Sequence, residues 1–67
     1  MNKFAERLKS TLKTNSMQQI DLAKEIGLSK SAVNDYCRGK REPSFDILIK
    51  ICKALDESAD YLLGLED

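Results

Sequence analysis

Residues 19–38 read QIDLAKEIGLSKSAVNDYCR, and this stretch decides the fold. Apolar residues recur with helical spacing on both sides of Gly27-Leu28-Ser29, a connection so short that it permits only a sharp corner. Ala23 is small enough to let the second helix approach, and Gly27 adopts a left-handed backbone conformation easily. Val33 is expected to fill the angle between the helices. The stretch therefore predicts two short helices packed at a steep angle.

Working outward, five segments show the apolar period of a helix, and none alternates with the period of a strand. Ser16, with Gln19 three residues later, is predicted to open the second helix as a capping box. Ser29 and Ser58 are predicted N-caps of the third and fifth helices, and Pro43-Ser44 is expected to open the fourth. The expected helices are 2–13, 17–26, 30–38, 45–55 and 59–63, with stops at Gly27, Gly39 and Gly64. The expected core consists of Phe4, Leu8, Leu12, Leu22, Ala23, Ile26, Val33, Tyr36, Leu48, Ile51, Cys52, Leu55 and Leu62.

Length and composition restrict what such a chain can do. With 67 residues, we expect a single domain over 1–67 that is too small for a substrate pocket. Histidine is absent and there is no Gly-rich phosphate loop, which argues against an enzyme. Cys37 and Cys52 are too few for a disulfide scaffold or a zinc site, so we expect free thiols and neither metal nor cofactor. Because no apolar run has the length of a signal peptide or a membrane span, we expect a cytoplasmic protein without membrane contact.

Charge is distributed unevenly along the chain. The net charge is +0, but residues 1–41 carry nine Lys and Arg against four Asp and Glu. Residues 42–67 carry two Lys against seven Asp and Glu. A basic first part of this kind can face phosphates, whereas the acidic second part faces solvent or a partner.

The predicted third helix carries a polar face. Lys30, Asn34 and Arg38 are spaced by four residues, so they lie on one side of the helix, with Ser31 and Asp35 beside them. All five side chains donate or accept hydrogen bonds. The major groove of DNA admits one helix and presents a distinct donor and acceptor pattern for each base pair. This face therefore indicates a DNA-reading surface.

The same stretch resembles the helix-turn-helix of the phage-repressor family, also called Xre or Cro-like. The resemblance continues through RGKREPS at 38–44, LIKICKALD at 48–56 and SADYLLGL at 58–65, and so covers nearly the whole chain. It implies a compact, all-α, five-helix lambda-repressor-like domain with its motif at 19–38. It also implies a sequence-specific regulator of transcription that binds double-stranded DNA, which we predict to be a repressor.

The resemblance also implies roles for particular residues. Lys30 and Ser31 are the first candidates for base contacts, followed by Asn34 and Asp35. Asp35 has an alternative role as the ion-pair partner of Arg38 one turn on. The expected phosphate contacts are Gln18 and Gln19 at the start of the second helix, together with Arg38, Lys40 and Arg41 after the third.

One pair of positions departs from the family pattern. Members often carry a basic residue late in the first helix and a Glu late in the third, and these form an ion pair. Leu12 and Cys37 stand at the matching positions, so we expect an apolar contact there instead.

The expected partner is a palindromic operator bound by a homodimer, at least on DNA. Phe45, Tyr61 and Leu65 are candidate dimer contacts, although they could equally close the core. No small-molecule ligand is expected. The alternatives are a protein-interaction module on the same fold, using the acidic residues near 56–67, and an antitoxin or a restriction-system controller subunit.

Overall fold

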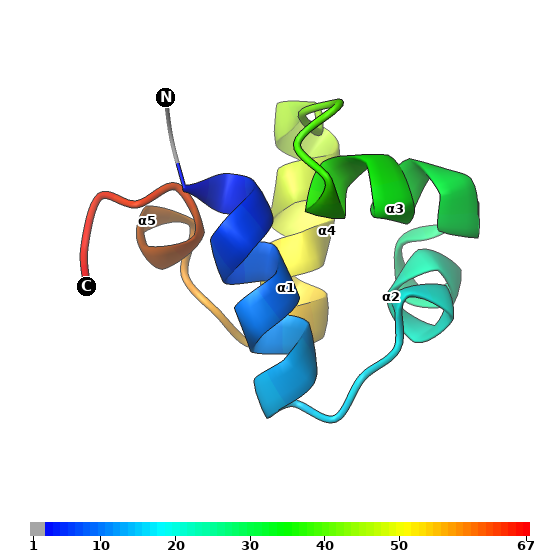
Figure 1. The fold of residues 1–67 in the computed structure, drawn as a ribbon, viewed down its shortest axis with the longest axis horizontal. Helices are drawn as coiled ribbons and strands as arrows, with labels where there is room; N and C mark the ends of the chain where they lie inside the picture. The colour runs from blue at the N-terminus through cyan, green and yellow to red at the C-terminus, as the bar shows by residue number, and fades with distance from the viewer. Residues whose placement is uncertain (1–2) are drawn as a thin grey trace.

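The computed structural model describes residues 3–67, and within them the chain forms five α-helices and no strand (Figure 1). The helix that runs through the centre of the view, α1, packs against α3 and α5, while α4 packs against α2 and α5. This arrangement confirms the predicted all-α fold. None of these helices is long and apolar enough to cross a membrane. Their bounds are α1 (Phe4–Thr14), α2 (Gln19–Ile26), α3 (Lys30–Cys37), α4 (Phe45–Leu55) and α5 (Ala59–Leu62).

Two of the three predicted serine caps, Ser29 and Ser58, are confirmed, and Ser44 caps the helix that Pro43-Ser44 was expected to open. The hydroxyl oxygens of Ser29, Ser44 and Ser58 accept hydrogen bonds from backbone N–H groups three residues on, at 3.2, 3.2 and 3.1 Å. Such a bond satisfies one of the free N–H groups at a helix start. Each cap fixes the point at which α3, α4 or α5 begins.

The prediction that Ser16 caps the second helix is wrong. Helix α2 begins at Gln19, and Gln18 is the capping residue, whose backbone N–H donates to Asp21 Oδ2 at 3.0 Å. A carboxylate is a stronger acceptor than the neutral amide of Gln19. This favours the capping box formed by Gln18 and Asp21 over the one predicted for Ser16 and Gln19.

Ser16 instead ends α1. Its φ of +54° is left-handed, and the N–H of Met17 donates to the carbonyl of Leu12 at 2.9 Å. This closing turn satisfies carbonyl groups that the helix end leaves free. The other four helices end in the same way, each with one left-handed residue followed by a bond to the carbonyl five residues back; these residues are Gly27, Gly39, Asp56 and Gly64.

The core follows the predicted apolar faces with a few corrections. Leu48 and Cys52 are only half-buried, although both pack against the core. Thr11 and Ala32 are buried without having been predicted. The remaining predicted core residues are all buried; they are Phe4, Leu8, Leu12, Leu22, Ala23, Ile26, Val33, Tyr36, Ile51, Leu55 and Leu62.

Leu12 and Cys37 both belong to this buried cluster, in agreement with the apolar environment expected at these two positions. Both cysteines are free thiols. Burial raises the pKa of Cys37, with a smaller opposing effect from the charge of Lys9. The pKa of Cys52 is also raised, mainly by burial. Because the thiolate is the reactive form, both groups are held in their unreactive state at neutral pH.

Candidate nucleic-acid interface

The corner between α2 and α3 is built as the sequence predicts. Val33 is fully buried between the helices and Ala23 is 1% exposed, so the two helices approach closely. Gly27 adopts a φ of +73° and ends α2, and Ser29 opens α3 two residues later. The direction of α3 is therefore fixed by packing and by backbone geometry, which leaves its outer side chains available for binding.

Helix α3 divides into a buried face and an open face. Its buried side chains are Ala32, Val33, Tyr36 and Cys37. The four residues predicted to contact bases lie together on the other side, where they line an open hollow of about 340 Å³; they are Lys30, Ser31, Asn34 and Asp35. Lys30 and Ser31 are exposed, whereas Asn34 and Asp35 are half-buried.

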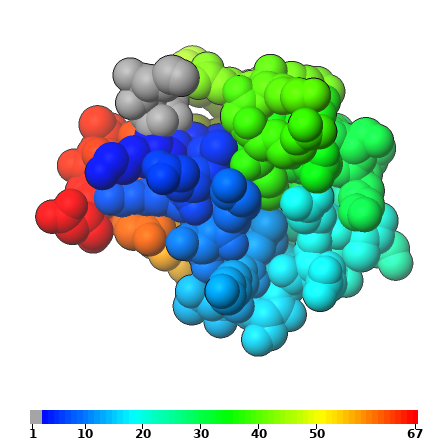
Figure 2. Space-filling model, in the orientation of Figure 1, coloured from blue at the N-terminus to red at the C-terminus, as the bar shows by residue number. Residues whose placement is uncertain are grey.

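A second hollow, of about 420 Å³, lies between α3 and the start of α2. Lys30 and Asn34 line it from α3, and the predicted phosphate contacts Gln18 and Gln19 line it from α2. Asn34 Nδ2 donates a hydrogen bond to Gln19 Oε1 at 3.2 Å, across the corner. Because the two hollows share Lys30 and Asn34, the predicted base contacts and two predicted backbone contacts lie on one continuous surface. The segments that carry it, coloured cyan and green, lie at the same end of the molecule in Figure 2.

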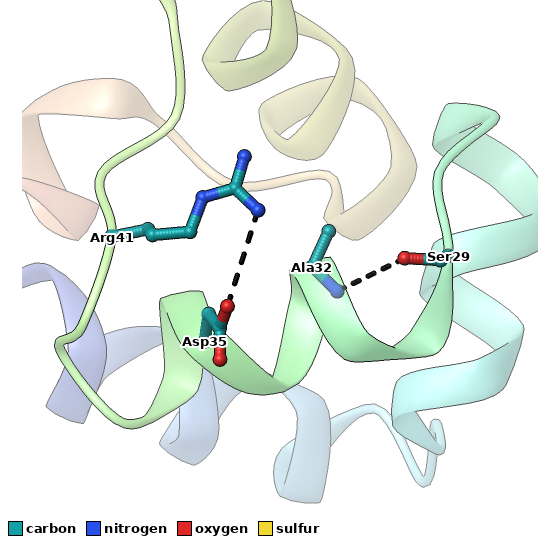
Figure 3. Close-up of polar contacts among 4 residues, drawn as sticks. All are labelled: Ser29, Ala32, Asp35 and Arg41. Atoms are coloured by element: carbon teal, nitrogen blue, oxygen red, sulfur yellow. Dashed lines mark hydrogen bonds and ion pairs between the residues drawn. The ribbon is translucent and has the colours of Figure 1, made fainter.

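Asp35 forms its ion pair with Arg41 rather than with the expected partner, Arg38. The Arg41 Nη1 and Asp35 Oδ2 atoms lie 3.9 Å apart (Figure 3). The Arg41 guanidinium also lies over the ring of Tyr36, 5.8 Å from its centre. The segment after α3 turns back over the helix, which brings Arg41 within reach of Asp35. At 59% side-chain exposure Arg41 remains accessible, and the Asp35 carboxylate is partly neutralised where it faces the hollow.

The other basic residues of this surface are free. Lys30, Arg38 and Lys40 are exposed, and within residues 3–67 their side chains make no hydrogen bond or ion pair. Lys30 lies at the start of α3, whereas Arg38 and Lys40 follow its end. The arrangement is a cationic frame around a polar helix face, which suits a polyanion with hydrogen-bonding groups in a groove.

Ile20 is a component of this surface that the sequence analysis did not find. Its side chain is apolar, yet it is 42% exposed and lines the second hollow beside Lys30 and Asn34. A signal existed in the helical geometry, because Ile20 lies roughly a third of a turn away from the centre of the face formed by the buried residues of α2.

Comparison with known proteins agrees with this geometry. Residues 8–62 match the family model HTH_3, described as helix-turn-helix. The chain is 40% identical over 60 residues to YqaE of Bacillus subtilis (strain 168), an uncharacterized HTH-type transcriptional regulator. This match covers 90% of the chain but 52% of YqaE, and the chain spans about half the length of several curated relatives.

Two solved structures are similar over almost their whole length. The P22 c2 repressor in complex with synthetic operator 9T superposes with a TM-score of 0.90 at 32% identity, covering 98% of this chain and all of that one. The restriction-modification controller protein C.AhdI from Aeromonas hydrophila gives a TM-score of 0.83 at 33% identity, covering 90% of this chain and 91% of that one.

Proposed function

The chain belongs to the helix-turn-helix family HTH_3, and from this premise we propose that it is a sequence-specific regulator of transcription, a repressor, that binds double-stranded DNA. The observation that carries the proposal is the outer face of α3. Its four polar residues line an open hollow rather than an enclosed pocket, and free cations flank them. An exposed helix of this kind fits the major groove and offers no site for catalysis on a small molecule.

Within this proposal, the position of each residue decides whether it contacts a base edge or a phosphate. Lys30 and Ser31, exposed at the start of α3, contact base edges, and Lys donates to the guanine O6 and N7 atoms. Asn34 and Asp35 lie one turn further on, in the same hollow. Arg38, Lys40 and Arg41 follow the helix and contact phosphates. Gln18 and Gln19 contact the backbone from the start of α2, where free N–H groups favour anions.

We further propose that two copies bind a palindromic operator, as is usual for small domains of this type. The exposed apolar residues Phe45, at 84%, and Leu65, at 74%, support a contact between copies. Tyr61 is half-buried beneath Arg7 and contributes less to this surface than its sequence position suggests. Sedimentation of the wild type and of Phe45→Ala, free and on a palindromic duplex, tests the pairing. A wild-type monomer under both conditions would reject it.

A controller of a restriction system is a second candidate, which the similarity to C.AhdI supports. A controller would use the same DNA contacts, so this role differs from the first in the genes that are regulated and not in the DNA-binding site. A module that binds only proteins remains the less favoured alternative, because such a module has no need for free Lys30, Arg38 and Lys40 around one polar face. For either DNA-binding role we place the protein in the cytoplasm and assign the whole of 1–67 to one DNA-binding domain.

Salt-dependent binding to duplex DNA tests the proposal. If two copies neutralise about six phosphates through Arg38, Lys40 and Arg41, the logarithm of the association constant should fall with the logarithm of salt concentration with a slope of about −5. The measurement is a gel-shift titration at several salt concentrations, with Lys50→Ala as the matched control because Lys50 lies on α4, outside this surface. A protein-binding module would show weak binding and no steep slope.

A further inference from the structure

One side-chain hydrogen bond joins the two helices of the motif within the described residues. Asn34, in the middle of α3, donates from Nδ2 to Oε1 of Gln19, the first residue of α2, at 3.2 Å. The two residues are fifteen positions apart, so the bond exists only when the corner has folded. Both side chains are half-buried, which shields the bond partly from competing water.

The direction of this bond fixes which atoms remain available. A glutamine side chain has one oxygen that accepts and one NH₂ group that donates. Because Asn34 occupies the oxygen of Gln19, the Gln19 NH₂ group is the part left for another partner. Phosphate oxygens only accept hydrogen bonds, so the bond holds Gln19 in the orientation that a phosphate requires.

The bond also limits Asn34. Reading adenine with both hydrogen bonds takes the oxygen and the NH₂ group of an Asn together. The hydrogen bond to Gln19 uses one of the two N–H bonds of Asn34 and fixes the orientation of its amide relative to α2, so the remaining oxygen and N–H are not free to turn towards a base pair. The geometry therefore favours a role for Asn34 between the helices over a role at a base edge.

We propose that Asn34 is a positioning residue that acts on DNA through Gln19. It holds the Gln19 amide so that the NH₂ group donates to a backbone phosphate, and it thereby couples α3 to the phosphate contact made by α2. The inference rests on the proposed function and revises one residue of it. Asn34 sets affinity for every duplex rather than the choice of base. A prearranged side chain loses less freedom on binding, an effect of about two- to tenfold in affinity.

A double-mutant cycle tests the coupling. Gln19→Ala, Asn34→Ala and the double variant are titrated by fluorescence anisotropy against a duplex selected from a random pool and against its scrambled sequence. We expect Asn34→Ala to weaken binding to both duplexes by the same factor, about two- to tenfold, and to cause no further loss when Gln19 is already Ala. Additive effects would overturn the proposal.

Two further variants separate positioning from simple structural support. Gln19→Glu keeps an oxygen that accepts from Asn34 but offers no donor to a phosphate, so we expect an unchanged unfolding temperature with at least tenfold weaker binding. Ser31→Ala is the matched control on the same face; it lacks a bond to α2 and should change preference at one base pair. If Asn34→Ala changes preference in this way and leaves scrambled DNA unaffected, Asn34 is a base reader and the inference is wrong.

The remaining outcomes are also decisive. If Asn34→Ala lowers the unfolding temperature and its binding loss disappears at a temperature where the variant is fully folded, its role is structural and the inference fails. Failure of the proposed function looks different, since the wild-type protein would then bind neither duplex at any salt concentration, and the inference would fall with it.

Discussion

The two ends of the molecule are held together in different ways. At the α2–α3 end, buried apolar side chains and backbone turns fix the corner, and most charged side chains make no internal contact. At the α5 end, a helix of four residues is held by its buried Leu62 and by one charged side chain, Arg7 of α1. The difference shows which cations are free for a ligand. Arg7 is committed to the fold, whereas Lys30, Arg38 and Lys40 are available.

The contacts of Arg7 are specific. Its guanidinium lies 4.4 Å from the centre of the Tyr61 ring, and Nη1 donates to the Tyr61 carbonyl at 2.9 Å and to the carbonyl of Glu66. The Ser58 hydroxyl donates to Glu66 Oε1 at 2.8 Å, which also ties this segment down. One planar group thus connects α1 to both α5 and the segment that follows it.

The largest effect is expected from the core of the α2–α3 end. Leu22 is completely buried, so Leu22→Ala should lower the free energy of unfolding by about 2–5 kcal/mol through lost burial and a remaining cavity. In a domain of this size such a loss leaves much of the protein unfolded. Thermal unfolding followed by circular dichroism measures it. Leu65→Ala is the control, since Leu65 is 74% exposed and should change stability by less than about 0.5 kcal/mol.

The α5 end should respond to the loss of one charge. Arg7→Ala removes the ring contact and the bonds to backbone carbonyls, which should cost about 2 kcal/mol. Arg7→Lys should recover little of this stability. An ammonium group is not planar, so it cannot lie flat over the ring while it donates to two carbonyls. Urea unfolding gives the free energies, with Lys9→Ala as a matched exposed control. Equal stability of Arg7→Ala and Lys9→Ala would show that the α5 end is held by apolar contacts alone.

A smaller effect is expected at the corner itself. A Cβ added at Gly27 would meet no atom within 4 Å, so Gly27→Ala carries only the cost of the left-handed backbone, about 1 kcal/mol. Gly27→Asn should cost less, because Asn tolerates this conformation better. Urea unfolding of both variants should place Asn between Gly and Ala. The reverse order would mean that side-chain contacts, and not the left-handed backbone, determine the stability of variants at position 27.

The smallest effect has the opposite sign. Ser16 ends α1 in a left-handed conformation without being a glycine, so Ser16→Gly should stabilise the protein by about 0.5–1 kcal/mol. Ser10→Gly, in the middle of α1, is the matched control and should destabilise it by about 0.5 kcal/mol. Differential scanning calorimetry should move the two transition temperatures in opposite directions. A lower transition temperature for Ser16→Gly would contradict this account of how α1 ends.

These positions show what could be predicted from the sequence. Helices that stop at Gly27, Gly39 and Gly64 were predicted, since the residue type itself favours the left-handed turn. The same turn at Ser16 and Asp56 leaves no such signal, and Ser16 was assigned to the wrong helix for this reason. The outcome there depends on the competing cap formed by Gln18 and Asp21.

The candidate site shows the same division. Helical spacing was enough to place the predicted base contacts on one face, because that geometry is local. The Asn34–Gln19 bond and the Asp35–Arg41 pair were not predicted, because the first depends on how α2 and α3 pack and the second on how the segment after α3 turns back over the helix. Spacing by one turn suggested Arg38 as the partner of Asp35, yet the segment after α3 brings Arg41 closer to it.

The central claim is that α3 lies in the major groove with its first turn at the bases and its following segment at phosphates. Titrating Lys30→Ala and Lys40→Ala against the selected and the scrambled duplex at several salt concentrations tests it most directly. Lys30→Ala should cost roughly 1–3 kcal/mol on the selected duplex and relax preference at one base pair, whereas Lys40→Ala should weaken both duplexes equally and lower the salt slope by about 1. If Lys30→Ala also weakens both duplexes equally, Lys30 contacts a phosphate and the placement of α3 in the groove is wrong.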